Sequence, residues 1–336
     1  MAKPGRTMNS KTLRTLNAML RCLHNASRRS TEETQEVPLA SKKPKERDRR
    51  PNAQSQKTEE VVDPLPGQLE EKFRRSLGRH NLHFDMLEVS VQTFANTLSQ
   101  QPEEATYIRG QAKKLGFHSL YPDATFASAR AYLIYSHIAY VFNAGDVLCE
   151  GIRSMSSMKA LKGSNPVMFN EIDTGDFVRK TLALVVLAAM SPESRDAVSV
   201  NARVLQLVKT HASFALVDYF RIVRNEELHG DGVAGLRVSA ARNALPVDLI
   251  RGRYSEMPSA VALSARDALL CSKAWQGVAE WLCRHMLSDA EAQALLKGRF
   301  GRLAANRRET AARRFLELQL LYSEDDINTM LFTLSW

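Results

Sequence analysis

The stretch DTGDFVRKTLALVVLAAMSP, residues 173–192, holds a helix start, a helix body and a helix stop. Asp and Thr at its beginning are typical N-caps, and Ser191-Pro192 is a typical stop. Between them, Leu182 to Met190 is the longest uninterrupted apolar run in the chain, at nine residues. A membrane-spanning helix needs roughly 20 such residues, so the run predicts a helix buried in a protein core and excludes an integral membrane protein.

The same helical periodicity, near 3.6 residues, extends outward from this stretch in both directions. Apolar residues from Leu82 to Leu98, including Leu87 and Phe94, predict one helix that stops near Gln101-Pro102. Ser288-Asp289 is a start signal for another. The pattern predicts further helices over 126–162, 177–190, 200–229, 259–287, 288–298, 299–322 and 325–336, the last packing back on the body.

Strand signals are few. Residues 233–254 mix isolated apolar residues with Gly, Pro, Asn and Arg, and they favour a loop with a short hairpin. No βαβ alternation and no repeat of 20–50 residues is visible. The sequence therefore predicts an all-α fold, an elaborated helical bundle with a disordered basic N-terminal tail.

Charge separates the tail from the body. The chain of 336 residues has a formal net charge of +9, of which residues 1–60 carry +7. Residues 11–29 resemble a basic amphipathic helix, and residues 30–67 have the composition of a linker. We predict four segments: the tail and linker (1–67), N-terminal helices of the body (68–120), a helical core (121–290) and C-terminal helices (291–336).

Localisation follows from cysteine usage and from the tail. The four cysteines form no CxxC pair, which favours a reduced, cytoplasmic protein. The tail has no acidic residue before Glu32, a profile shared by mitochondrial transit peptides, and that compartment is the alternative. The nearly neutral body argues against a surface coated with nucleic acid.

Motifs for cofactors and metals are weak. Residues 230–235 match GxGxxG, but dinucleotide binding requires a strand before the glycines, and here a helix is predicted. His80 with His83, and Cys283 with His285, lack the further ligands that zinc needs. We therefore predict no cofactor and no metal.

One stretch, LVDYFRIVRNEELHGDG at residues 216–232, is unusual for the end of a helix. Helical geometry places Leu216, Phe220 and Val223 on one arc, which is expected to face the core. Arg221, Asn225 and His229 follow each other at i, i+4 and i+8 and form a polar stripe, with Arg224 beside it.

These groups suit RNA cleavage by attack of the RNA's own 2′-hydroxyl. That reaction needs an acid or base that titrates near neutral pH, which His229 supplies. It also needs a cation for the charge that develops on phosphorus, which Arg224 supplies through bidentate contacts. Asn225 is placed to hold the imidazole or the phosphate, and the substrate carries its own nucleophile.

Residues 224–230, RNEELHG, resemble the Arg-Asn-x3-His signature of the HEPN superfamily. The resemblance implies an all-α fold, a motif near the end of a long helix, and a metal-independent endoribonuclease of toxin–antitoxin or antiphage systems. It implies that Arg224 and His229 are catalytic and that Asn225 supports them. It also implies a homodimer whose motif helices share one composite site, an RNA substrate, and a neutralising partner protein in some systems.

Two alternatives remain at this stage. Arg221, Arg224 and His229 can simply form ion pairs or stabilise the helix end, where a cation is favourable. The chain is then a catalytically inactive helical interaction or nucleic-acid-binding protein. Residues 297–314 hold seven Lys/Arg and only Glu309 as an acid. This segment is either a solvated face or an RNA contact, and the residues we predict for RNA binding are Arg221, Arg299, Arg302, Arg307 and Arg308.

Overall fold

The computed structural model describes residues 63–116, 125–165, 177–229, 234–259 and 262–334. At 177, 192, 227–229, 234 and 235 it describes the backbone alone. The described residues form 13 α-helices, one short 3₁₀ helix at Pro192–Ser194 and no strand, so the predicted all-α fold class is confirmed. The tail (1–62) and the start signal at 173–176 lie outside the described residues. None of the described helices is both long and apolar enough to span a membrane.

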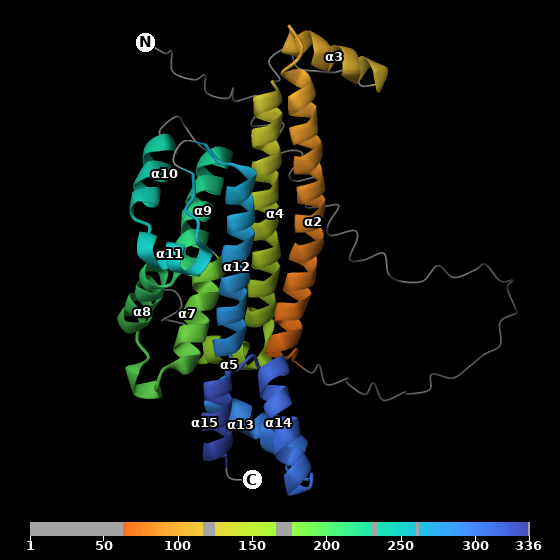
Figure 1. Cartoon of the computed structure of the whole chain (residues 1–336). Coiled ribbons are helices and arrows are strands. Elements are labelled where there is room, and N and C mark those ends of the chain that lie inside the picture. The colour runs from red at the N-terminus through yellow and green to blue at the C-terminus, as the bar shows by residue number, and fades with distance from the viewer. Residues whose placement is uncertain (1–62, 117–124, 166–176, 230–233, 260–261, 335–336) are drawn as a thin grey trace, which may run out of the picture.

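Four long helices form the main bundle: α2 (Pro66–Leu98), α4 (Phe126–Ser154), α9 (Ala212–His229) and α12 (Ala265–His285). Figure 1 shows α12 lying between α4 and α9, and it contacts α2 as well. The apolar pattern predicted α2 only in part, because the helix begins at Pro66 and Leu82 and Leu87 are exposed.

Trp275 of α12 is the centre of the main bundle. Its side chain is fully buried, and its ring meets Phe142 of α4 edge-on, with centroids 5.4 Å apart. Gly145 of α4 allows this approach, because a Cβ at that position would lie 2.3 Å from atoms of the tryptophan ring. The bundle is thus built around one large aromatic side chain and a glycine that makes room for it.

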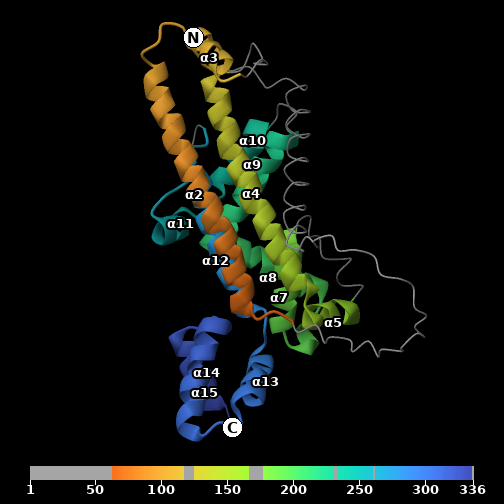
Figure 2. The ribbon, with the colours of Figure 1, turned by 90° about the vertical axis from the view of Figure 1, so that its right-hand side faces the viewer.

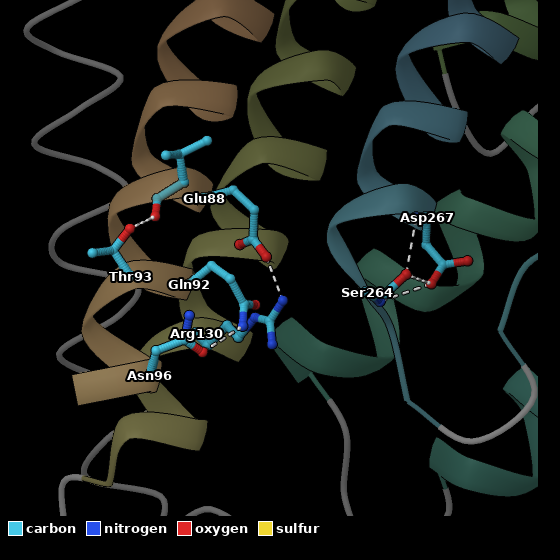
Figure 3. Close-up of polar contacts among 8 residues, drawn as sticks. Glu88, Gln92, Thr93, Asn96, Arg130, Ser264 and Asp267 are labelled. Carbon is cyan, nitrogen blue, oxygen red and sulfur yellow. Dashed lines mark hydrogen bonds and ion pairs between the residues drawn. The ribbon is translucent and has the colours of Figure 1, made fainter. Parts of the chain in front are cut away.

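Polar contacts join α2 to α4 and cap the start of α12 (Figure 3). Glu88 of α2 forms an ion pair with Arg130 of α4. Ser264 caps α12: its hydroxyl accepts a hydrogen bond from the backbone N–H of Asp267, while the Asp267 carboxylate accepts from the N–H of Ser264 at 2.7 Å. This reciprocal arrangement is a capping box, and it fixes the start of α12.

Three shorter helices, α5 (Ser156–Ser164), α7 (Phe177–Ala189) and α8 (Ala197–Thr210), pack beside the bundle. The apolar run in α7 is buried as predicted, and the helix ends before Ser191-Pro192. Two predicted helices are wrong as single units. The 126–162 helix is broken at Met155, and the 200–229 helix at His211, because both residues take extended backbone conformations.

The loop and hairpin predicted at 233–254 are also wrong. This segment forms α10 (Ala234–Asn243) and α11 (Val247–Tyr254). An isolated hairpin is marginally stable in water, and Ala240, Ala241 and Arg242 are strong helix formers. Ile250 of α11 is fully buried in the core, so packing outweighs the turn-forming residues nearby.

Residues 289–334 form a C-terminal module of three helices: α13 (Asp289–Phe300), α14 (Ala305–Gln319) and α15 (Glu324–Thr333). The module has its own apolar cluster and lies at one end of the main bundle, whereas α3 (Glu104–Lys114) lies near the other (Figures 1 and 2). The capping box of Ser288 confirms the predicted start of α13. The single helix predicted over 299–322 is wrong, because α13 extends to Phe300 and α14 begins only at Ala305.

Two contacts join the C-terminal module to the main bundle. Gly67 of α2 lies against α14, where a Cβ would approach the carbonyl oxygen of Leu318 to 2.4 Å. Arg284, near the end of α12, forms an ion pair with Asp326 of α15. The last segment therefore packs within the module and meets the body at its edge.

Candidate functional site

The motif residues lie on the last turns of α9, where that helix packs between α10 and α12. Leu216, Phe220 and Val223 are buried in the main core, as the sequence pattern predicted. Arg221, Arg224 and Asn225 are partly buried on the remaining face. His229 is the last residue of α9, one turn after Asn225, and its side chain lies outside the described residues.

Arg224 is held by two neighbours. Its guanidinium carbon lies 4.6 Å from the centroid of the Phe142 ring on α4, within cation–π range. Its Nε and Nη2 both donate to Oδ1 of Asn225, at 3.3 and 3.2 Å. The guanidinium is therefore presented by packing in a defined orientation, with Asn225 as its partner.

The charge of Arg224 also reaches the interface between α9 and α12. Burial raises the pKa of the Cys271 thiol well above its ordinary value, and the positive charge of Arg224 opposes this rise. The effect of burial on this pKa is larger than that of Arg224, so Cys271 is a neutral core thiol. The same holds for Cys283, whose pKa burial also raises. These two cysteines are unsuited to metal binding or nucleophilic chemistry at neutral pH.

Arg221 belongs to a charged triad that spans two helices. The Oδ1 atom of Asp218 accepts from Nε and Nη2 of Arg221 at 3.0 and 2.8 Å. The same oxygen accepts from Nη2 of Arg179, on α7, at 2.9 Å. The three side chains are between 23% and 28% exposed. Two cations share one carboxylate, so the triad carries a net positive charge beside the motif.

Sequence reasoning missed Arg179 and Asp218. Each was visible as a charged residue within an apolar helical run, where an unpaired charge is costly to bury. That signal indicates a partner but not which one, because the two residues lie 39 positions apart.

Arg237 of α10 is the third arginine near the motif. It forms an ion pair with Glu226 at 3.0 Å, and the arginine is 70% exposed. Glu226 of the motif segment is thus paired with an arginine of α10.

The four other arginines predicted to bind RNA are far from the motif. Arg299, Arg302, Arg307 and Arg308 all belong to the C-terminal module or its connecting turn. Figure 1 places that module at the opposite end of the bundle from α10 and the last turns of α9. The structure brings Arg221, Arg224 and Asn225 together and leaves these four apart.

A second polar cluster, buried between α2, α4 and α12, involves two histidines. His137 is almost fully buried, and its Nε2 lies 3.0 Å from Oγ of Ser272. The His80 ring stacks on that of His137 at 4.9 Å and on that of Tyr140 at 3.5 Å. Desolvation, followed by repulsion from a neighbouring histidine, lowers the pKa of His137 to about 3 and that of His80 to about 4. Both rings are neutral at physiological pH.

The weak metal motifs gain no further ligands within the described part of the chain. Among the described residues, no group of three or more His, Cys, Asp or Glu lies close enough together to hold a metal ion. The GxGxxG match follows helix α9, as predicted, so the strand that a dinucleotide fingerprint needs is replaced by a helix.

No protein-family model, curated protein or solved structure matches this chain.

Proposed function

We propose that the chain is a HEPN-like, metal-independent endoribonuclease whose site is the end of α9. The observation that carries the proposal is the pairing of Arg224 with Asn225 on the last turns of a long bundle helix, one turn before His229. A second long helix, α12, packs beside it, which is the context that the HEPN resemblance leads us to expect.

The chemistry assigns one role to each residue. The 2′-oxygen of the RNA attacks the adjacent phosphorus, and the bond from phosphorus to the 5′-oxygen breaks. His229 takes the proton from the 2′-hydroxyl as a general base, or delivers a proton to the departing 5′-oxygen as a general acid. Arg224 stabilises the charge on the phosphoryl oxygens. Asn225 positions Arg224. The products are a 2′,3′-cyclic phosphate and a 5′-hydroxyl, so no water is consumed in this step.

The positive triad supports binding of the substrate. Arg221 and Arg179 add cationic charge on the side of α9 that precedes the motif, and their shared carboxylate fixes their orientation. A phosphate next to the cleaved one is the group that these arginines are suited to contact.

The HEPN resemblance also underlies our proposal for the assembly and the setting. Two protomers place their α9 ends together in a homodimer, and each presents Arg224 and His229 to one composite site. The enzyme acts in the cytoplasm as a toxin or antiphage effector, and a neutralising protein restrains it.

A cleavage assay in excess chelator tests the proposal. Wild type should cleave RNA, whereas Arg224→Ala and His229→Ala should lose cleavage while keeping fold and dimeric state. Arg75→Ala is a matched control, because Arg75 is an exposed α2 arginine whose partner is Glu71. Cleavage that survives both motif substitutions would place the activity elsewhere.

The contact of Arg224 with Phe142 favours one alternative, a catalytically inactive helical interaction protein. In that case Arg224 serves to join α9 to α4. Arg224→Ala would then lower the free energy of unfolding, and the well-folded wild-type dimer would cleave none of several RNA substrates.

A further inference from the structure

The C-terminal module carries a groove that the motif on α9 does not explain. We call it the α14 groove, a hollow of about 670 Å³ along one face of α14 and the end of α13. Arg307, Thr310, Arg314 and Leu318 line it from α14, and Phe300 lines it from α13. The rings of Phe300 and Phe315 meet edge-on at 5.5 Å and form its floor.

The charge of this groove is not neutralised within the described part of the chain. Arg307 and Arg314 are both exposed, lie two helical turns apart, and form no ion pair with any described residue. The two acidic residues of α14, Glu309 and Glu317, lie outside the groove lining, and Glu309 pairs with Arg313 at 3.9 Å. At the inner edge, Arg299 lies over the Phe315 ring at 5.0 Å.

The start of α14 places cations where helix electrostatics disfavour them. The N-terminus of a helix is its positive end, and acidic residues stabilise it. Helices α13 and α15 of the same module follow this rule, with Ser caps and acidic first turns. Helix α14 has no side-chain cap and no acid in its first turn, and Arg307 lies there. A local rule broken without a structural gain is expected at functional sites.

The lining is suited to a nucleic-acid strand. Two exposed arginines about 10 Å apart along the helix are suited to contact two phosphates of one strand, and the apolar floor beside them is suited to bases. We propose that the α14 groove docks the phosphodiester backbone of RNA and tethers a long substrate away from the cleavage site. The choice of RNA rests on the proposed ribonuclease function.

The distance between the α14 groove and the motif at the end of α9 sets a minimum length for an RNA that contacts both. Helix α12, which separates the module from the end of α9, has 21 residues and is therefore about 30 Å long. Only an RNA long enough to span the bundle can use both sites of one chain.

The test measures binding without cleavage. The full chain carrying Arg224→Ala is titrated into a fluorescein-labelled, single-stranded 30-nucleotide RNA, and anisotropy is followed at several salt concentrations. Arg307→Gln with Arg314→Gln removes the groove charge. Lys297→Gln with Arg313→Gln is the matched control, because it removes the same charge from the same module outside the groove lining and outside the residues predicted to bind RNA.

The groove variant should raise Kd at least tenfold and should lower the slope of log affinity against log salt by about 1.4, or 0.7 for each lost phosphate contact. The control variant should change Kd by less than threefold. The melting temperature of the groove variant provides a second readout. Because the helix dipole disfavours Arg307, this variant should melt at a temperature no lower than that of its parent.

Equal weakening in the two double variants would overturn the proposal, since it indicates diffuse electrostatics. An unchanged Kd in the groove variant would overturn it as well. Failure of the ribonuclease proposal is seen separately, as absence of cleavage by wild type. A groove-dependent loss of RNA binding would support the docking site even then.

Discussion

The motif end of the main bundle and the α14 groove use arginine in opposite ways. In the bundle, Arg224 lies over Phe142, and Arg179 and Arg221 share Asp218, so packing and hydrogen bonds fix each cation. In the module, Arg307 and Arg314 are exposed and form no ion pair with a described residue.

The difference follows from what each kind of site requires. Stabilising charge on one phosphorus demands a cation held in place, because its advantage depends on orientation before the reaction begins. Binding a flexible polyanion demands exposed cations along the path of the strand, but not cations locked in one orientation, because counterion release supplies much of the affinity. The bundle is therefore the region suited to chemistry, and the module is the region suited to tethering.

The largest effect is expected from breaking the bundle core. Trp275→Ala removes the side chain around which α4 and α12 pack, and large-to-small changes of this kind cost about 3–5 kcal/mol. Urea unfolding should show this loss. Phe332→Ala, at a position that is 92% exposed in the module, should change the free energy of unfolding by less than about 0.5 kcal/mol. A similar loss in both variants would contradict the location of the core.

Acid should weaken the bundle through its buried histidines. Folding lowers the pKa of His137 to about 3 and that of His80 to about 4, from a value near 6.5 in the unfolded chain. As the pH falls, the unfolded state therefore binds protons before the folded state does. The contribution of the neutral rings to the free energy of unfolding is complete above pH 6.5 and is lost as the pH falls toward 4.

For His137 this loss amounts to about 1.4 kcal/mol per pH unit, and for the more exposed His80 it is smaller. Urea unfolding at pH 7.5 and pH 5.0 measures it. His137→Gln should show a smaller pH dependence than wild type over this interval, and burial of His80, His211 and His285 accounts for part of what is left. A wild-type stability that does not change between the two pH values would contradict the burial of these rings.

Asp218→Asn should remove the negative charge that holds Arg179 and Arg221 in place. The substitution leaves Arg179 and Arg221 without their shared carboxylate, so we expect a loss of about 1–2 kcal/mol in unfolding free energy and slower RNA cleavage. Asp85→Asn, on the exposed surface of α2, is the control and should alter neither quantity. Full cleavage by Asp218→Asn would exclude the triad from substrate binding.

The smallest effect should come from Arg237→Gln. Arg237 pairs with Glu226, but it is mostly exposed, and such ion pairs contribute less than about 0.5 kcal/mol. Chemical denaturation in low salt is the measurement. A loss as large as that of Asp218→Asn would remove the distinction between fixed and exposed arginines near the motif.

Local patterns predicted the helical fold class but not every boundary. The pattern predicted one buried face of α9, and that face holds Leu216, Phe220 and Val223, because burial follows the helical period directly. The break at His211 and the helices α10 and α11 depend on packing against other elements, which no local window contains.

The sequence predicted the residues of the candidate site that lie on α9, but not those that reach it from other helices. The sequence pattern selected Arg224 and Asn225 as site residues, but not the hydrogen bonds between them, because consecutive residues of a helix point in different directions. Arg179 joins the site from α7, and Phe142 from α4, through tertiary contacts alone. The α14 groove was visible as a basic segment, but its aromatic floor was not.

The chemistry of the RNA ends tests the central claim most directly. Wild type is incubated, in excess chelator, with an RNA that it cleaves at one position and with the same RNA carrying a single 2′-deoxy substitution there. The account predicts a 2′,3′-cyclic phosphate and a 5′-hydroxyl from the first substrate and no cleavage at that position in the second. A 3′-hydroxyl with a 5′-phosphate, or equal cleavage of the 2′-deoxy substrate, would contradict attack by the 2′-hydroxyl at the end of α9.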